Sequence, residues 1–249
     1  MPAIRPNNWM AVYNSILKSY SGVFELIIIS PYPLPKEMDN ISNIKYIKSF
    51  SNPVRATQIG LLYAEGKYIY PTHADDAYLI EGALDKNIEL LVSMGDYKDN
   101  IVVCKYSESR NLEHPDRYQN DDYYKIVNAY APGNHYIPKD WWIFNTVIMH
   151  TEFLFELGGY DCSYTACPYA HADLACRAQI RSATVQMSPY PLIRCDHGQD
   201  DHGPIEHAQL GHDAPLFHSV YCKPLNTVNP RIDLNNWQNA PAVWSLRFK

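Results

Sequence analysis

Apolar positions in the first fifty residues follow two periods, one typical of helices and one typical of strands. An apolar face with a period of about 3.6 residues starts after Asn7 or Asn8 and stops before Gly22, which predicts a helix. The near-continuous apolar run over 24–30 predicts a strand that is buried on both faces. The alternating segment over 44–50 predicts a second strand.

The alternation of strands and helices continues through the next part of the chain. Asn52 and Pro53 form the cap and first-residue pattern of a helix, which Gly66 ends. Further elements are expected as a strand over 67–72, a helix over 78–93, and strands over 101–106 and 123–129. This order predicts an α/β fold with a mostly parallel sheet flanked by helices. Ligands of such sheets bind at the carboxyl ends of the strands.

The second half of the chain is less regular, because residues 107–140 are polar, aromatic and rich in proline. Beyond them we expect an apolar strand over 141–150, a short helix from Thr151 to Gly158, and a helix over 168–181. Little periodicity remains after about residue 215. We therefore expect one domain over 1–215 and a C-terminal arm over 216–249 that packs on it.

Composition narrows the class of protein. Apolar residues make up 46% of the 249 residues and charged residues 19%, which is typical of a globular chain. No apolar run is long enough to span a membrane, and the first residues show no signal segment. A net charge of −6 without a basic block argues against a nucleic-acid partner. Six cysteines without a CxxC pair favour reduced thiols and a cytoplasmic location, with a zinc site at Cys162 and Cys167 as the alternative.

Two adjacent carboxylates, Asp75 and Asp76, follow the predicted strand over 67–72. Such a pair repels itself unless a cation lies between it and a substrate. Mn²⁺ or Mg²⁺ together with diphosphate oxygens would relieve that repulsion. An Asx-rich turn that caps the next helix is an equally good reading of the spacing.

Three stretches, in the correct order, resemble the family 2 glycosyltransferases of GT-A fold. Residues 63–84 (YAEGKYIYPTHADDAYLIEGAL) resemble the strand and acidic cluster of the DXD type, and residues 144–179 resemble the block with LGG-[FY]-D and D-x-D-L. Residues 25–31 (ELIIISP) resemble the second strand, and the likeness extends over about 2–205. The resemblance implies a Rossmann-like GT-A domain. It also implies metal-dependent, inverting transfer of a sugar from a nucleotide-diphosphate donor to a hydroxyl group of a glycan or another acceptor.

The resemblance also implies site residues. Asp76 would bind the metal. The donor would contact Pro2, Ala3, Arg5, Ser30, Pro31, Asn52, Arg55, Gln58 and Asp75. The donor sugar and the acceptor would contact Trp141, Trp142, Asn145, Gly158 and Gly159. Core packing is the alternative for the two tryptophans, and a helix stop is the alternative for the two glycines.

The sequence departs from the family pattern in three places. The opening strand is nearly absent, and His73 stands where the first acid is expected. His171 stands at the position of the catalytic base. An imidazole with a pKa near 6.5 can take a proton from a hydroxyl group. Asp173 is the other candidate base, although on a helix it would face Arg177 at i+4. A core histidine or a metal ligand is the alternative role for His171.

Histidines recur every five residues from His197 to His212, a spacing that fits neither a helical nor a strand face. We expect the segment 196–212 to be mobile without donor and to close over the diphosphate. His202 would then join Asp76 as a metal ligand, in preference to His197. Two other functions remain open: a nucleotidyltransferase, whose Gly-rich signature is missing, and a catalytically inactive module that binds nucleotide sugars or glycans.

Overall fold

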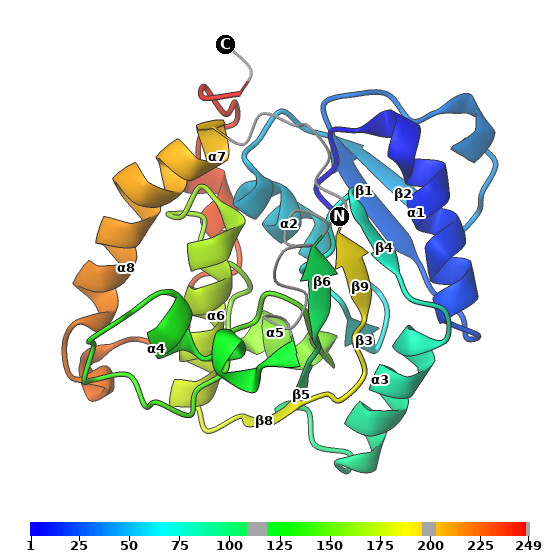
Figure 1. Ribbon diagram of the computed structural model, residues 1–249. Helices are drawn as coiled ribbons and strands as arrows, with labels where there is room; N and C mark the ends of the chain where they lie inside the picture. Colours follow the sequence, from blue (N-terminus) through cyan, green and yellow to red (C-terminus); the bar gives the residue numbers. More distant parts are fainter. Residues whose placement is uncertain (109–118, 196–202, 248–249) are drawn as a thin grey trace.

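The computed structural model describes residues 1–108, 119–195 and 203–247. Strands occupy the centre of the molecule, with α1 (Pro6–Ser19) and α3 (Ala83–Ser93) on one side and α6 (Cys167–Ile180) and α8 (Ala214–Tyr221) on the other (Figure 1). The N-terminus lies near the middle, close to β1 (Figure 1). The architecture is a mixed α/β fold, as predicted.

The strands form three small sheets. The first pairs β1 (Leu26–Ser30) with β2 (Ile44–Lys48) in parallel, and Pro2 adds a parallel bridge to Ile29. The second has the order β3 (Tyr68–Ile69), β7 (Val147–His150), β5 (Asn100–Val103) and β8 (Thr184–Met187). The third has the order β4 (Ala77–Leu79), β9 (Ile193–Cys195) and β6 (Tyr106–Glu108). The β1–β2, β5–β8 and β6–β9 pairs are parallel and the β3–β7, β5–β7 and β4–β9 pairs are antiparallel, so the second and third sheets are mixed rather than mostly parallel.

The remaining elements are short helices and turns. The other α-helices are α2 (Pro53–Leu61), α4 (Ile126–Ala129), α5 (Thr151–Glu156) and α7 (Gly203–Ala208). Single 3₁₀ turns cover Lys36–Met38, Asp121–Tyr124, Leu225–Thr227 and Asn236–Asn239, and a π-helical turn over Gln209–Asp213 joins α7 to α8. Helix α6 runs through the interior and is buried around most of its circumference.

The elements with strong periodicity are confirmed. The first helix, the strands at 24–30 and 44–50, and the helices that begin at Pro53, Thr151 and Cys167 all form close to their predicted bounds. Asn52 caps α2 as expected, because its side chain accepts a hydrogen bond from the backbone N–H of Arg55 at 2.8 Å.

Several predictions of secondary structure differ from the structure. Residues 78 and 79 belong to strand β4, and α3 starts only after Gly82, whose φ of 66° breaks the backbone path. The segment 123–129 is largely helical rather than extended. The strand predicted over 141–150 forms only at Val147–His150.

The predicted boundary at residue 215 falls inside the helical run that ends with α8. The division into a domain and an arm stays a prediction.

Two expectations about the class of protein can be compared with the structure. None of the helices in the described segments combines the length and the apolar character that a membrane crossing requires. All six cysteines lie in described segments, and each is a free thiol.

Candidate functional site

Asp75 lies at the centre of a tight network beneath the start of α1. Its carboxylate is 1% exposed. Its Oδ2 atom accepts hydrogen bonds from the backbone N–H groups of Ile4 and Arg5, both at 2.6 Å, and from the indole Nε1 of Trp9 at 3.1 Å. The Arg5 guanidinium pairs with Oδ1. Asp75 therefore anchors the chain that leads into α1, and its acceptor capacity is largely used.

Asp76, the second of the two adjacent carboxylates, is 3% exposed. Its Oδ2 atom lies 3.4 Å from the guanidinium of Arg5, so the same arginine serves both aspartates. The next residue, Ala77, pairs with Cys195 at the end of β9. Burial raises the pKa of the Cys195 thiol, and the negative charges of Asp76 and Glu108 raise it further. These two carboxylates therefore flank one thiol.

Glu108 was not among the predicted site residues. It ends β6 in register with Cys195, which brings it to the same edge as Asp76. In the sequence it belongs to a polar stretch without periodicity. Its position directly after a short apolar strand was the available signal, since carboxyl ends of strands collect ligand-binding groups.

His73 takes the place of the first acid in the cluster and is buried, with 7% of its surface exposed. Neither of its ring nitrogens hydrogen-bonds to another described residue. Burial lowers the pKa of His73 to about 3, the positive charge of the Met1 ammonium lowers it further, and Asp76 opposes the shift. The imidazole is therefore neutral at physiological pH and lies edge-on to Tyr70 at 5.2 Å between ring centroids.

The described residues do not assemble a divalent-cation site around the two aspartates. Among residues 1–108, 119–195 and 203–247, no group of three His, Cys, Asp or Glu side chains could hold a metal ion. The Arg5 guanidinium contacts both carboxylates, at the place where a cation would relieve their repulsion. His202, the predicted partner ligand of Asp76, lies outside the described residues, as does His197.

His171, the predicted base, sits on α6 with 9% of its surface exposed. Burial lowers its pKa to about 3. The ring lies edge-on to Tyr160, with 5.7 Å between the centroids. A neutral imidazole can accept a proton, but this environment penalises the charged form that results.

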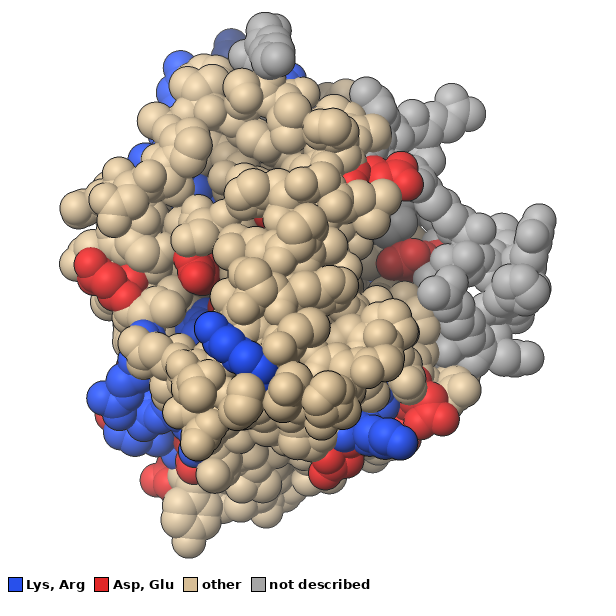
Figure 2. Space-filling view, turned by 90° about the vertical axis from the view of Figure 1, so that its left-hand side faces the viewer, with Lys and Arg blue, Asp and Glu red and all other residues tan. Residues whose placement is uncertain are grey.

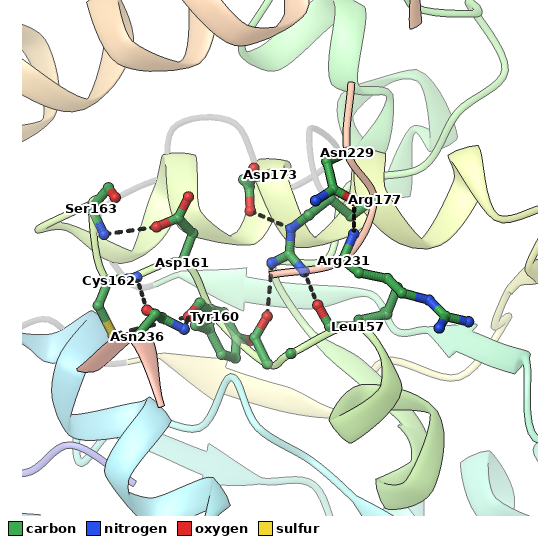
Figure 3. Close-up of polar contacts among 12 residues, drawn as sticks. Leu157, Tyr160, Asp161, Cys162, Ser163, Asp173, Arg177, Asn229, Arg231 and Asn236 are labelled. Atoms are coloured by element: carbon green, nitrogen blue, oxygen red, sulfur yellow. Dashed lines mark hydrogen bonds and ion pairs between the residues drawn. The ribbon is translucent and has the colours of Figure 1, made fainter. Parts of the chain in front are cut away.

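Asp173, the other predicted base, lies in a buried hydrogen-bond network on α6. Its carboxylate accepts hydrogen bonds from Arg177 Nε at 2.8 Å and from the Tyr221 hydroxyl at 2.7 Å. Arg177 in turn donates to the carbonyl oxygens of Leu157 at 2.9 Å and Gly159 at 2.7 Å. Figure 3 shows Asp173 and Arg177 pointing toward each other above Leu157. Burial raises the pKa of Asp173, yet the paired guanidinium opposes this. These contacts give Asp173 a structural role, and its role as the catalytic base stays a prediction.

Three predicted donor contacts on or beside α2 also serve the fold. Gln58 donates to the carbonyl oxygens of Gly158 at 3.0 Å and Leu234 at 2.7 Å, and its Oε1 accepts from the backbone N–H of Tyr160 at 2.7 Å. Arg55 donates to the carbonyl oxygen of Trp237 at 3.0 Å. Asn52 is the helix cap already described. Gln58 and Arg55 thus hold the C-terminal arm and the turn after α5, and a contact of these three residues with a donor stays a prediction.

Gly158 and Gly159 form that turn with φ angles of 84° and 71°. A Cβ atom on Gly158 would lie 2.1 Å from the carbonyl oxygen of Ile232, and one on Gly159 would lie 2.1 Å from Gln58 Oε1. Only glycine allows the arm to approach so closely. The Asn236 side chain closes the contact by accepting from the backbone N–H of Cys162 at 2.7 Å (Figure 3). Both glycines therefore have structural reasons to be there.

The predicted acceptor side contains a cluster of phenols around Asn145. Its Nδ2 donates to the Tyr106 hydroxyl at 3.1 Å, and its Oδ1 accepts from the Tyr130 hydroxyl at 3.4 Å. The half-buried Trp142 lies close by in sequence, with Lys125 over its ring and its backbone bonded to Gln179. Trp141 is half-buried too. Of this predicted set, Asn145 lies among the polar groups that suit a sugar.

The residues predicted to meet the nucleotide base lie along β1. Pro2 bridges to Ile29, Ala3 is buried beside it, and Ser30 Oγ accepts from the backbone N–H of Tyr32 at 3.1 Å. Pro31 is half-buried. Their carboxyl-end position agrees with the prediction, while their contact with a base remains a prediction.

Figure 2 shows the helical face, which is largely uncharged. Lysine and arginine side chains lie on it in separate groups, and those of the described residues form no continuous basic band on this face. The absence of a nucleic-acid partner stays a prediction.

Comparisons with known proteins bear on the fold. No family model matches the sequence, and no curated protein matches it. The structure is similar to the crystal structure of GalNAc-T7 with UDP, GalNAc and Mn²⁺, with a TM-score of 0.52 and 12% identity over 76% of this chain. The chain spans 41% of the length of that protein. At this identity the likeness concerns the fold alone, and it supports an α/β fold of the GT-A type without indicating family 2.

Proposed function

We propose that this protein is a glycosyltransferase that binds a nucleotide-diphosphate sugar at the edge formed by Arg5, Asp75, Asp76 and Glu108. The observation that carries the proposal is the cluster of charged side chains where several strands end in a GT-A-like fold. Sheets of this kind bind ligands at that edge. The similar structure was solved with a nucleotide and a sugar, which adds support.

In this proposal Arg5 has the central role. Asp75 accepts hydrogen bonds from the backbone N–H groups of Ile4 and Arg5 and pairs with the Arg5 guanidinium through Oδ1, so the arginine is held in one position. A guanidinium held in this way can bind diphosphate oxygens with two parallel hydrogen bonds. It would stabilise the negative charge that grows on the leaving diphosphate during sugar transfer.

The acceptor hydroxyl needs a base, and we propose His171 for that role. Its neutral form can take the proton while the hydroxyl oxygen attacks the anomeric carbon from the face opposite the leaving group, which inverts the configuration. Cys167, at the first turn of the same helix, lies close enough to the Met1 ammonium for their charges to interact, and so does Asp75. The amino end of α6 thus lies near the proposed donor edge.

The divalent cation is the least supported part of the proposal. Arg5 already pairs with both aspartates, and the described residues supply no complete coordination site. Mn²⁺ or Mg²⁺ with Asp76 and His202 as ligands therefore remains a prediction, and none of the steps above depends on it. Nucleotide binding has to be measured both with Mn²⁺ and with a chelator.

A catalytically inactive binding module is the alternative, and one observation favours it. The pKa of His171 falls to about 3, which makes the imidazole a weak base in this state of the protein. Such a module would bind nucleotide sugars without turning them over.

The two proposals are separated by measuring binding and turnover on the same samples. Calorimetry with UDP, GDP and their sugar conjugates tests binding, and release of free nucleotide tests transfer or hydrolysis. Arg5→Lys keeps the positive charge but loses the planar guanidinium that can donate two parallel hydrogen bonds. Nucleotide binding should therefore weaken roughly tenfold or more. Arg231→Ala is the control, because Arg231 is exposed and its side chain points away from the Asp173 network in Figure 3. Unchanged binding in Arg5→Lys would overturn the proposed site.

A further inference from the structure

His212 and Asp213 are consecutive residues in the π-helical turn that joins α7 to α8. The Nδ1 atom of His212 lies 2.7 Å from Oδ1 of Asp213, which is a hydrogen-bonding distance. Because a carboxylate only accepts hydrogen bonds, Nδ1 carries the hydrogen. Single π-helical turns inside helices occur frequently at functional sites. We call this pair the surface dyad.

The carboxylate of the surface dyad is fixed from its other side. Asp213 is 0% exposed and accepts hydrogen bonds from the backbone N–H of Thr165 at 3.0 Å and from its Oγ1 at 3.1 Å. It also accepts from the backbone N–H of Ala166 at 2.6 Å. These two residues directly precede α6. A carboxylate held by several donors keeps one orientation, and it therefore also orients the imidazole that donates to it.

The imidazole of the surface dyad is open to solvent. The His212 side chain is 56% exposed, whereas that of Asp213 is 0% exposed. The buried carboxylate occupies the Nδ1 side of the ring, so Nε2 lies on the exposed side. In a neutral ring with its hydrogen on Nδ1, Nε2 has a free lone pair. A carboxylate, an oriented imidazole and a free ring nitrogen are the parts of a general base.

The surface dyad lies on the side of the molecule where β2 ends. Ala166 and Ala208 form a small apolar cluster with Trp244. The backbone N–H of Trp244 donates to the carbonyl oxygen of Phe50, which follows the carboxyl end of β2, at 3.0 Å. Carboxyl ends of strands are where sheets of this kind bind ligands.

The amino end of α6 connects the surface dyad with the proposed donor edge. Cys167 lies close enough to both Asp213 and the Met1 ammonium for their charges to interact. His171 follows one turn further along the same helix and is only 9% exposed. The two histidines at this end of α6 therefore differ in their access to water, and water can reach Nε2 of His212 directly.

We propose that the surface dyad activates water and so hydrolyses the nucleotide-diphosphate sugar, a second activity that rests on the proposed function. Nε2 of His212 takes one proton from the water, whose oxygen forms a bond to the anomeric carbon of the sugar. The bond from that carbon to the diphosphate oxygen breaks, and its electron pair stays with the diphosphate. The products are the free sugar and the nucleoside diphosphate. Asp213 is a positioning residue, because it acts through His212.

Hydrolysis is measured without an acceptor, on UDP-glucose, UDP-N-acetylglucosamine and GDP-mannose. His212→Ala should lower the release of free sugar by roughly 10²–10⁴-fold. His207→Ala is the matched control, because His207 is exposed on α7 of the same helical run, and it should keep the rate. Added imidazole should raise the rate of His212→Ala by at least about tenfold, since it replaces the lost base. A merely structural role of His212 would give no such rescue.

The role of Asp213 is tested by nitrogen NMR, which locates the hydrogen on the His212 ring without any substrate. At about pH 8, where an ordinary imidazole is neutral, the wild type should carry it on Nδ1. In Asp213→Asn the amide can donate to Nδ1, which moves the hydrogen to Nε2 and should abolish hydrolysis. A wild-type hydrogen on Nε2 would overturn the proposal.

Calorimetry with UDP on the same samples separates this proposal from the proposed function. If the wild type binds UDP but releases no free sugar, the hydrolysis is disproved and the proposed function stands. Equal hydrolysis by the wild type and His212→Ala would likewise overturn the role of the surface dyad. If the wild type does not bind UDP or GDP, the proposed function fails and this activity fails with it.

Discussion

Two buried aspartate–arginine pairs in this molecule differ in how the charge is shared. Asp173 and Arg177 form a one-to-one pair, and two further guanidinium hydrogens go to the carbonyl oxygens of Leu157 and Gly159. At the other pair, the single guanidinium of Arg5 is shared by Asp75 and Asp76. The first pair lies inside the helical half, and the second lies at the end of strands.

The difference separates a structural ion pair from a candidate binding site. A buried pair with matched charges and hydrogen bonds fixes the fold and gains nothing from a ligand. When two carboxylates share one guanidinium, their charges are not fully matched, and a charged ligand can change that balance of charge. Charged clusters of this kind concentrate at functional sites. The predictions below test that contrast, beginning with the largest effect.

The matched pair should give the largest loss of stability. Arg177→Met leaves the buried carboxylate of Asp173 without its cation, which should cost about 3–5 kcal/mol of unfolding free energy. Chemical denaturation measures the loss. The double variant Asp173→Leu with Arg177→Met should recover part of it, because no unpaired charge remains. A single variant that loses less than about 1 kcal/mol would show that the pair is not buried as described.

Replacing Asp75 should lower the stability of the protein, as replacing a member of the matched pair does, and by more than replacing its neighbour Asp76. Asp75→Asn weakens the hydrogen bonds from Ile4, Arg5 and Trp9, and should cost about 2–3 kcal/mol. Thermal denaturation checks this. The near-ultraviolet circular dichroism of Trp9 should change at the same time. If Asp75→Asn keeps full stability but abolishes nucleotide binding, Asp75 is a ligand-binding residue and the contrast fails.

Acid should destabilise the protein through its two buried histidines. The pKa values of His73 and His171 are about 3, below the value near 6.5 of an unfolded chain. Below pH 6.5 the unfolded state takes up protons that the folded state cannot, so stability falls as pH decreases toward 3. At pH 5 the loss is about 2 kcal/mol for each histidine. In His171→Phe, the difference in unfolding free energy between pH 7 and pH 5 should shrink by that amount. An unchanged difference would mean that His171 is accessible to water.

Asp76 should matter least for stability and most for binding. Asp76→Asn keeps the shape and removes one of the two charges that share Arg5, while Asp75 still pairs with the arginine, so the unfolding free energy should change by only about 1 kcal/mol. Calorimetry should show nucleotide diphosphate affinity reduced roughly tenfold in the presence of Mn²⁺. The comparison is made in EDTA as well. Equal affinity of the wild type in Mn²⁺ and in EDTA would rule out a metal ligand at Asp76.

The sequence predicted the fold where periodicity was strong and local. The helix at Pro53 was found because Asn52 and Pro53 are a complete start signal. Strand β4 was missed because its three residues end at Leu79, which also fits the apolar face of the following helix. The order of strands in the mixed sheets could not be predicted, since pairing depends on contacts between distant segments.

The sequence predicted the two aspartates of the candidate site but not the residues that they contact. Adjacent carboxylates after a buried strand located Asp75 and Asp76. The pairing of Arg5 with both depends on a fold that brings residues about 70 positions apart together. Arg55 and Gln58 were expected as donor contacts from the resemblance alone. Their bonds to the C-terminal arm were not foreseen, because that arm has no signal in the sequence. Asp173 was expected to face Arg177, and that ion pair is confirmed.

The C-terminal arm has a consequence for the order in which the chain can fold. Gln58 binds the carbonyl oxygen of Leu234 across 176 residues, and the Ile232 N–H donates to Leu157 O at 3.2 Å. During synthesis the N-terminal part emerges first and folds as it is able to. The turn at Gly158 and Gly159 cannot acquire its final contacts until residues 232–234 have left the ribosome. We expect this arm to dock late, so that a nascent chain exposes the amide of Gln58 until Leu234 has emerged.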